Sequence, residues 1–135
     1  MSDQEGSLTP AQFEIMEMLW ESKSGLTVAE IWESVCTERD VARTTVLNLV
    51  DRLEKRNWLK REKVAGVFRY RANVDRPTTE GQLASEFVAK FFDGSPVSFV
   101  LSLLGSKKIS KAELQRLKSL LDNDNFKSSS SKGKG

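Results

Sequence analysis

The side chains best suited to molecular recognition lie just after Ala42. Here a helical pattern combines short hydroxyl and amide side chains with long cations. Asparagine can read adenine, threonine can contact the methyl group of thymine, and arginine can bind guanine or a phosphate. The chemistry indicated is base reading in the major groove of DNA, although this pattern alone does not exclude an ordinary surface helix. The candidate residues are Arg43, Thr44, Thr45, Leu47, Asn48 and Arg52.

More cations follow in two short alternating segments, at 58–63 and 67–71. Alternation predicts strands, and Val64-Ala65-Gly66 between them predicts the turn of a β-hairpin, with glycine supplying the special conformation. Cations on such a hairpin can follow the sugar-phosphate backbone and fix the register of a neighbouring helix. The predicted phosphate contacts are Lys60, Arg61, Lys63, Arg69 and Arg71.

The charge distribution along the chain supports this interpretation. Residues 1–41 carry nine acidic and two basic side chains, whereas residues 42–76 carry ten basic and four acidic ones. A formal net charge of only +2 for all 135 residues therefore conceals a strongly basic segment. Such polarisation favours attraction to phosphate, but a solvated basic face without a partner accounts for the charge alone equally well.

Catalytic chemistry is disfavoured by the composition. Histidine is absent, which removes the commonest general base and the usual zinc ligand. The single cysteine, Cys36, can form neither an intrachain disulfide nor a thiolate metal cage by itself. Acidic residues are scattered over helix surfaces without an obvious catalytic pair. We expect no enzyme, no cofactor and no metal site.

Three predicted helices position the recognition residues. The first begins at an N-cap Thr9, with Pro10 next and a capping-box Gln12, and ends near Ser22. The second follows the capping box of Thr27 and Glu30. The third buries residues spaced i, i+3, i+4 and i+7. Three helices followed by a basic hairpin predict a winged helix. The four residues expected to face the core from the third helix are Val46, Leu49, Val50 and Leu53.

Beyond the predicted winged helix the chain remains helical and unusually apolar. A linker at 73–77 precedes a helix from about Thr78, which 93–95 stops; Pro96 starts a second helix, and Ser110 and Glu113 open a third. Such apolar density indicates a dimerisation arm. The alternative is that these helices fold back and thicken the core. The residues expected to mediate dimerisation are Phe87, Phe91, Phe92, Phe99, Val100, Leu103, Leu104, Leu114, Leu117 and Leu121.

The expected fold class is mainly α with a small β-hairpin, a winged helix-turn-helix domain followed by a helical dimerisation arm. The expected boundaries are a flexible N-terminus at 1–7, the DNA-binding domain at 8–74, the dimerisation region at 75–122 and a disordered polar tail at 123–135. The polar, acidic N-terminus is unlike a secretory signal, and no apolar run reaches the roughly 18 residues of a membrane span. We therefore expect a cytoplasmic protein that does not insert into membranes.

Several blocks of sequence together resemble the penicillinase-repressor family, which includes β-lactam, methicillin-resistance and copper-responsive repressors. The resemblance spans nearly all of 8–121 and is carried by LTPAQFEIMEMLWES, TVAEIWESV, TTVLNLVDRLEKRNWL, FRYRANV and VLSLLGSKKISKAELQRLKSLL. It implies a winged-helix domain, a helical dimerisation region, and a homodimer that binds a palindromic operator and blocks transcription. It also implies that the DNA-reading helix begins at Ala42, with Arg43, Thr44, Thr45, Leu47 and Asn48 facing the groove.

The chain departs from its relatives at positions that bear on specificity and regulation. Some relatives have a basic residue in place of Leu47, which leaves the operator sequence open, and a glycine in place of Asn57. The tail SSSSKGKG lacks the cysteines of copper-responsive members, so copper sensing through that cluster is excluded. In β-lactam-responsive members a membrane sensor triggers cleavage of an Asn-Phe bond. The matching place here is Ser102-Leu103, so a membrane sensor protease stays an open alternative as partner, although these site residues do not support it.

Two classes of function follow from these patterns. The first is a homodimeric repressor on an inverted-repeat operator, and the second is a winged helix that binds a protein surface without binding DNA. Neither the operator sequence, the inducing signal nor the regulated genes can be derived from the residues.

Overall fold

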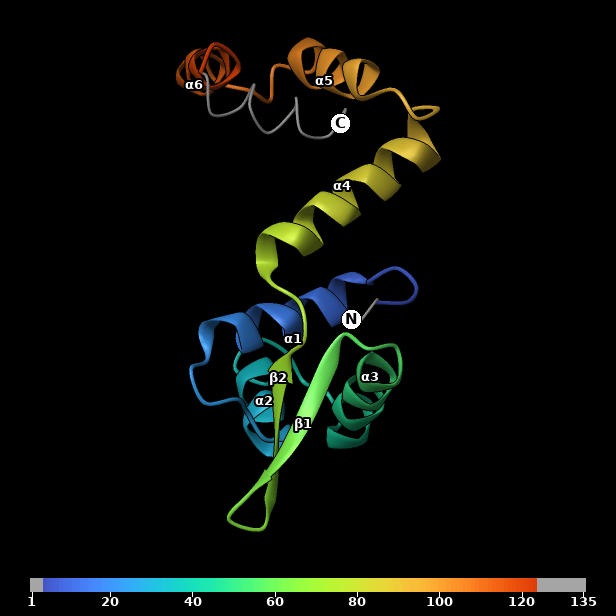
Figure 1. The fold of residues 1–135 in the computed structure, drawn as a ribbon, viewed down its shortest axis with the longest axis vertical. Helices are drawn as coiled ribbons and strands as arrows, with labels where there is room; N and C mark the ends of the chain where they lie inside the picture. Colours follow the sequence, from blue (N-terminus) through green and yellow to red (C-terminus); the bar gives the residue numbers. More distant parts are fainter. Residues whose placement is uncertain (1–3, 124–135) are drawn as a thin grey trace. The chain divides into compact units, whose positions relative to one another are not determined.

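The computed structural model describes residues 4–123, which form six helices and one two-stranded antiparallel sheet (Figure 1). These residues belong to two compact units, divided between Glu86 and Phe87. The expected fold class, mainly α with a small hairpin arranged as a winged helix-turn-helix, is confirmed. The elements are α1 (Pro10–Glu21), α2 (Val28–Val35), α3 (Arg43–Lys55), β1 (Leu59–Val64), β2 (Val67–Ala72), α4 (Arg76–Phe91), α5 (Pro96–Gly105) and α6 (Lys111–Leu121).

Capping boxes begin both α1 and α2, as predicted. The Thr9 hydroxyl accepts from the Gln12 amide at 3.2 Å, and the Gln12 side chain accepts from the Thr9 amide at 3.0 Å. Thr27 and Glu30 make the same reciprocal pair. Each box satisfies amide groups that have no partner within the helix, and a side-chain cap of this kind stabilises a helix by about 1 kcal/mol.

A single apolar core holds the three helices and the hairpin together. Of the four residues expected to face it from α3, Leu49 is only half-buried. Trp58, expected in the first strand, instead lies just before β1 and is 1% exposed. Its indole nitrogen donates to the carbonyl of Glu5 at 3.0 Å, which ties the N-terminal segment to this core. The buried members are Ile15, Met16, Leu19, Ile31, Val35, Val46, Val50, Leu53, Trp58, Leu59 and Tyr70.

The hairpin turn is tighter than expected. Val64 pairs with Val67 at the end of the ladder, so only Ala65 and Gly66 form the turn. Both have positive φ, at 52° and 82°, which matches the right-handed twist of the strands in two-residue turns. The predicted turn, residues 64–66, was therefore one residue too long. Asn57, just after α3, adopts the left-handed conformation, with φ 68°, which asparagine tolerates and which glycine, present there in some relatives, adopts freely.

The hairpin is joined to the segment before α2 by one further bridge. Leu26 and Tyr70 exchange both backbone hydrogen bonds, at 3.0 and 2.8 Å. The preceding Gly25 has φ 83°, and a Cβ atom there would lie 2.9 Å from the Tyr70 carbonyl oxygen. Only glycine fits this approach, so Gly25 allows the hairpin to close on the helices.

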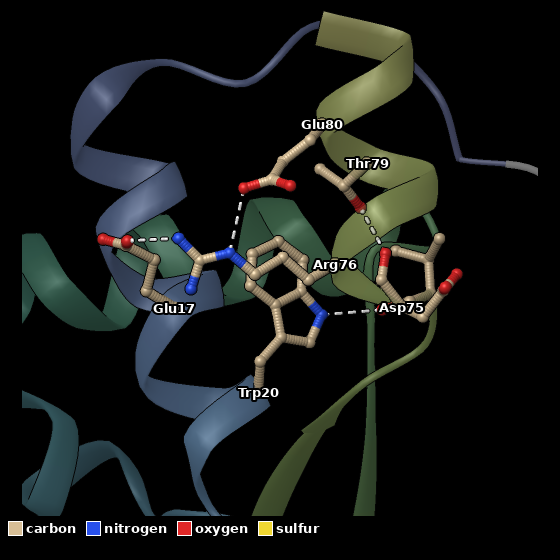
Figure 2. Close-up of polar contacts among 7 residues, drawn as sticks. Glu17, Trp20, Asp75, Arg76, Thr79 and Glu80 are labelled. Carbon is tan, nitrogen blue, oxygen red and sulfur yellow. Dashed lines mark hydrogen bonds and ion pairs between the residues drawn. The ribbon is translucent and has the colours of Figure 1, made fainter. Parts of the chain in front are cut away.

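Arg76 anchors the first turn of α4 to α1. Its guanidinium group lies between the carboxylates of Glu17 and Glu80, each at 3.0 Å (Figure 2). It also lies 5.6 Å from the ring centroid of Trp20, whose indole nitrogen donates to the Val74 carbonyl at 2.8 Å. The hydrogen bond to Glu80 raises the pKa of Arg76, so its charge is permanent.

These contacts explain why α4 begins at Arg76, two residues before the predicted start at Thr78. Pro77 occupies the second helical position, where its missing N–H is not needed. Thr79 is fully buried, and its hydroxyl donates to the Asp75 carbonyl at 3.1 Å (Figure 2).

The second unit contains the end of α4 together with α5 and α6. Rings of Phe87, Phe92 and Phe99 contact one another, with centroids 5.3–6.0 Å apart. Ser95 caps α5, and the predicted capping box of Ser110 and Glu113 caps α6. Within 4–123, no single helix is long and apolar enough to cross a membrane, and only the bent pair α4 and α5 passes that test when taken together.

Candidate nucleic-acid interface

The predicted recognition residues form one exposed face of α3. Val46, Val50 and Leu53 fix the helix on the core, so that the opposite side is presented to solvent. Ala42, at the N-cap, provides no side-chain oxygen to the first amides of the helix. Backbone N–H groups at such an end favour an approaching phosphate. Exposed on this face and its margins are Arg43, Thr44, Thr45, Leu47, Asn48 and Arg52.

One flank of this face is hollowed. A pocket of about 200 Å³ is lined by Thr45, Asn48, Leu49 and Arg52. It brings a hydroxyl group, an amide group and a guanidinium group together above an apolar floor. These groups can hydrogen-bond a base edge and the adjacent phosphate at the same time.

The same face carries one carboxylate, that of Asp51. Lys55, one turn later, lies 3.2 Å from it, and both side chains are more than half exposed. An ion pair at this spacing contributes only a few tenths of a kcal/mol, so either group is free to exchange its partner. The pair reduces the repulsion between Asp51 and a phosphate backbone.

The hairpin presents several of its cations in a mixed-charge hollow. A pocket of about 390 Å³ is lined by Lys60, Arg61, Glu62 and Arg71. Lys60 and Arg71 occupy paired positions on adjacent strands, and the Arg71 side chain lies 3.8 Å from Glu62. Adjacent cations on a strand pair repel each other unless an anion lies between them, which suits a phosphate.

The Phe68 ring contacts Arg61 and one further cation, Lys63, near the tip of the hairpin. The guanidinium carbon of Arg61 lies 4.2 Å from the ring centroid and the Lys63 ammonium 5.5 Å from it. Arg61 also pairs with Glu54 of α3 at 3.2 Å, which connects the hairpin to the recognition helix. Sequence reasoning missed Phe68 as a functional residue, because only the observed strand register, which pairs Phe68 with Lys63, places its ring on the face of Arg61.

Arg69 differs from the other cations of the hairpin. It donates to the Gly25 carbonyl at 2.9 Å and pairs with Glu30 at 3.3 Å, and its side chain is only 30% exposed. The guanidinium group is thus directed at the body of the winged helix. Its predicted phosphate contact stays a prediction, because both of these contacts engage its Nη1 group.

All residues of α5 and α6 lie in the part of the chain that the structure describes, and none of them is buried. Val97, Val100, Leu101 and Leu104 recur at i, i+3, i+4 and i+7 and are all exposed. The residues expected to mediate dimerisation divide into a half-buried and an exposed group. Phe92, Phe99 and Leu103 are half-buried, whereas Phe87, Phe91, Val100, Leu104, Leu114, Leu117 and Leu121 are exposed.

No group of three or more metal-ligating side chains occurs within residues 4–123. What the described surface offers is hydrogen bonding from α3 and positive charge from the hairpin. Both properties suit the recognition of nucleic acid.

Comparison with known proteins agrees with this geometry. The family model described as penicillinase repressor matches residues 8–123. The penicillinase repressor of Staphylococcus aureus is 24% identical, over 90% of this chain and 96% of the relative. The methicillin resistance regulatory protein MecI of Staphylococcus aureus (strain Mu50 / ATCC 700699) is also 24% identical, over 90% and 98%.

Among solved structures, a MarR family protein from Bacillus stearothermophilus is 23% identical, covers 75% of this chain and 71% of its own, and has a TM-score of 0.44. This structural similarity is too low to support an argument about the fold, which rests on the helices and strands described above. The family match, by contrast, extends over most of the chain. The chain belongs to the penicillinase repressor family.

Proposed function

We propose that this chain represses transcription as a homodimer on an inverted-repeat DNA operator, with α3 in the major groove and the hairpin on the phosphate backbone. The coarser statement, a DNA-binding repressor, follows from family membership. The observation that carries the finer proposal is the exposed polar face of α3 beside the cationic hollow of the hairpin. No catalytic step is required.

Base reading is assigned to the hydroxyl and amide groups of α3. Thr44, Thr45 and Asn48 are exposed and short, so the helix can approach the base edges closely. Arg43 and Arg52 are long enough to reach a base or a phosphate from the ends of this face. Specificity is therefore expected to depend on the three short side chains.

Backbone binding is assigned to the hairpin and accounts for most of the affinity. Each phosphate neutralised releases a counterion, so the logarithm of affinity falls linearly with the logarithm of salt concentration. Lys60, Arg61, Lys63 and Arg71 supply these charges in the proposal. Arg69 adds to the local positive potential without leaving its contacts to Gly25 and Glu30.

Dimerisation is assigned to the exposed apolar side chains of the second unit. The four exposed aliphatic residues of α5 form one apolar stripe, and such stripes commonly mark protein–protein interfaces. A two-fold dimer would present two α3 helices to major grooves about 34–36 Å apart, which explains an inverted-repeat operator. The proposed site of action is the cytoplasm, where bacterial DNA lies.

A membrane sensor protease is not part of this proposal. The Ser102-Leu103 peptide bond lies inside α5, and a protease requires an extended segment. Cleavage there would first need local unfolding of the helix. Derepression by a ligand or by another partner is left open.

Two variants of the full chain test the base-reading and backbone roles. Titration of fluorescent duplexes should show that Lys60→Ala weakens binding to operator and scrambled DNA alike, and reduces the salt slope by about one. Asn48→Ala should lower affinity for operator roughly tenfold or more while leaving scrambled DNA unchanged.

The competing class, a winged helix that binds a protein surface, makes the opposite prediction. Such a module would bind duplex DNA negligibly at any salt concentration. A flat salt series for the wild-type chain would therefore reject the repressor proposal. Equal losses on both duplexes for Asn48→Ala would reject base reading by that residue.

A further inference from the structure

Leu47 is an anomaly on the recognition face. It is 47% exposed, and it is the one large hydrophobic residue of α3 whose side chain is exposed. Thr44, one turn before it, and Asp51, one turn after it, are both polar and exposed. Single exposed leucines are common on protein surfaces and need no explanation by themselves. Its position, in the middle of a face otherwise made of hydrogen-bonding groups, does need one.

The flank on which Leu47 lies is the one nearest the hairpin. Glu54 is seven residues further along α3, which places it on the same side of the helix, two turns away. Glu54 pairs with Arg61 of β1 at 3.2 Å. Leu47 therefore lies on the side of α3 from which Glu54 reaches the hairpin.

Only one group on the base edges of the major groove suits an aliphatic side chain. Adenine, guanine and cytosine present hydrogen-bond donors and acceptors there, whereas thymine also presents its C5-methyl group. A leucine against a donor or acceptor would remove water from that group without replacing its hydrogen bond, which is costly. A leucine against a methyl group buries apolar surface on both sides.

We propose that Leu47 reads the C5-methyl group of one thymine in each operator half-site. The inference rests on the proposed function, because it assumes that α3 enters the major groove. It assigns a specificity that hydrogen bonds cannot supply, because thymine and the same base without its methyl group present the same donors and acceptors. Leu47 thus both favours thymine and rejects the more polar base edges.

The test removes one methyl group at a time from the DNA. An operator is first selected from random duplexes with the wild-type chain, and each thymine is then replaced by deoxyuridine, which keeps every hydrogen-bonding group. We expect one position per half-site at which this change weakens binding about fourfold, the value for burial of one methyl group. Leu47→Ala should bind the thymine operator more weakly and should not respond to deoxyuridine at that position.

Two controls make the result specific. Leu47→Met keeps an apolar side chain of similar volume and should retain the methyl effect. Val67→Ala changes an exposed apolar residue of the hairpin and should also retain it. Circular dichroism should show unchanged helix content for Leu47→Ala, because the side chain packs little in the fold and alanine favours a helix.

Each outcome is decisive. Selection of an operator without any methyl effect at a half-site position overturns the role of Leu47 and leaves the repressor proposal intact. A methyl effect that persists in Leu47→Ala overturns it as well, because another residue then reads the methyl group. Failure to enrich any duplex overturns the proposed function, and this inference with it.

Discussion

Arginines only a few residues apart in the hairpin have different neighbours. Arg61 lies over the Phe68 ring and beside Glu54, in the cationic region of the hairpin. The Arg69 side chain contacts Gly25, in the segment before α2, and Glu30, in the first turn of α2. A planar guanidinium group suits both environments, because it can stack on a ring and bind a carbonyl and a carboxylate together. Residue type alone therefore does not separate a DNA contact from a structural contact.

Arg69→Ala is expected to destabilise the winged helix. The change removes two charge-assisted hydrogen bonds from a partly screened site, which we expect to lower the free energy of unfolding by about 1 kcal/mol and the Tm by about 4–8 °C. Lys60→Ala, on the same hairpin, should leave the Tm unchanged. Thermal unfolding followed by circular dichroism compares the two variants. An unchanged Tm for Arg69→Ala, with a loss of DNA affinity equal to that of Lys60→Ala, would make Arg69 a phosphate contact instead.

Sequence was informative about residues wherever the relevant neighbours are close in the chain. The exposed face of α3, for example, follows from helical spacing. The contacts of Arg69 could not be predicted, because its partners precede it by 44 and 39 residues. Trp58 was placed in a strand, whereas its backbone amide donates to the Leu53 carbonyl at 2.9 Å and so belongs to the end of α3.

At the scale of elements, the helix starts were the best predicted features. A capping box is a local exchange of two hydrogen bonds over three residues, so the sequence contains both partners. The start of α4 was predicted two residues late, because it depends on Glu17 and Trp20 of α1, which hold Arg76 from outside the helix. The hairpin turn was one residue too long, because β-pairing of Val64 with Val67 is a property of two strands together.

The capping box of α6 should be visible as a titration. Hydrogen bonds from the Ser110 backbone amide and from its side chain hold the pKa of Glu113 below its usual value. A carboxylate with a lowered pKa stabilises the folded state above its unfolded pKa, and this contribution is lost as the pH falls through the folded pKa. We therefore expect the N-terminal turn of α6 to fray in acid, and carboxyl NMR to report a low pKa for Glu113.

Ser110→Ala should return the pKa of Glu113 part of the way towards its usual value, because the hydrogen bond from the Ser110 hydroxyl is lost whereas the one from its backbone amide is kept. Ser106→Ala is a matched control, since the Ser106 hydroxyl donates to Leu103 and does not contact Glu113. An unchanged Glu113 titration in Ser110→Ala would show that the capping box does not persist in solution.

For the molecule as a whole, charge and apolar surface are segregated along the chain. Most of the excess basic charge lies between 42 and 76, whereas long runs of exposed aliphatic side chains lie in α5 and α6. The first property suits a polyanion and the second suits another apolar surface. A repressor that reads two half-sites needs both, because a single α3 contacts too few bases to select one site among many.

Val100→Asp is expected to break the proposed homodimer. Val100 belongs to the exposed stripe of α5 and is 43% exposed in the single chain. In a two-fold interface each substitution occurs twice, and two valines buried at about 2 kcal/mol each correspond to a roughly thousandfold increase in the dimer Kd.

Val67→Asp is the matched control, because Val67 is exposed to a similar extent, at 49%, but lies on the hairpin. Sedimentation equilibrium of the full chain should find a monomer for Val100→Asp and a dimer for both wild type and Val67→Asp. Operator affinity should fall with the loss of the dimer, while binding to a single half-site should be unchanged. A dimer that survives Val100→Asp at micromolar concentration would move the interface away from this face of α5.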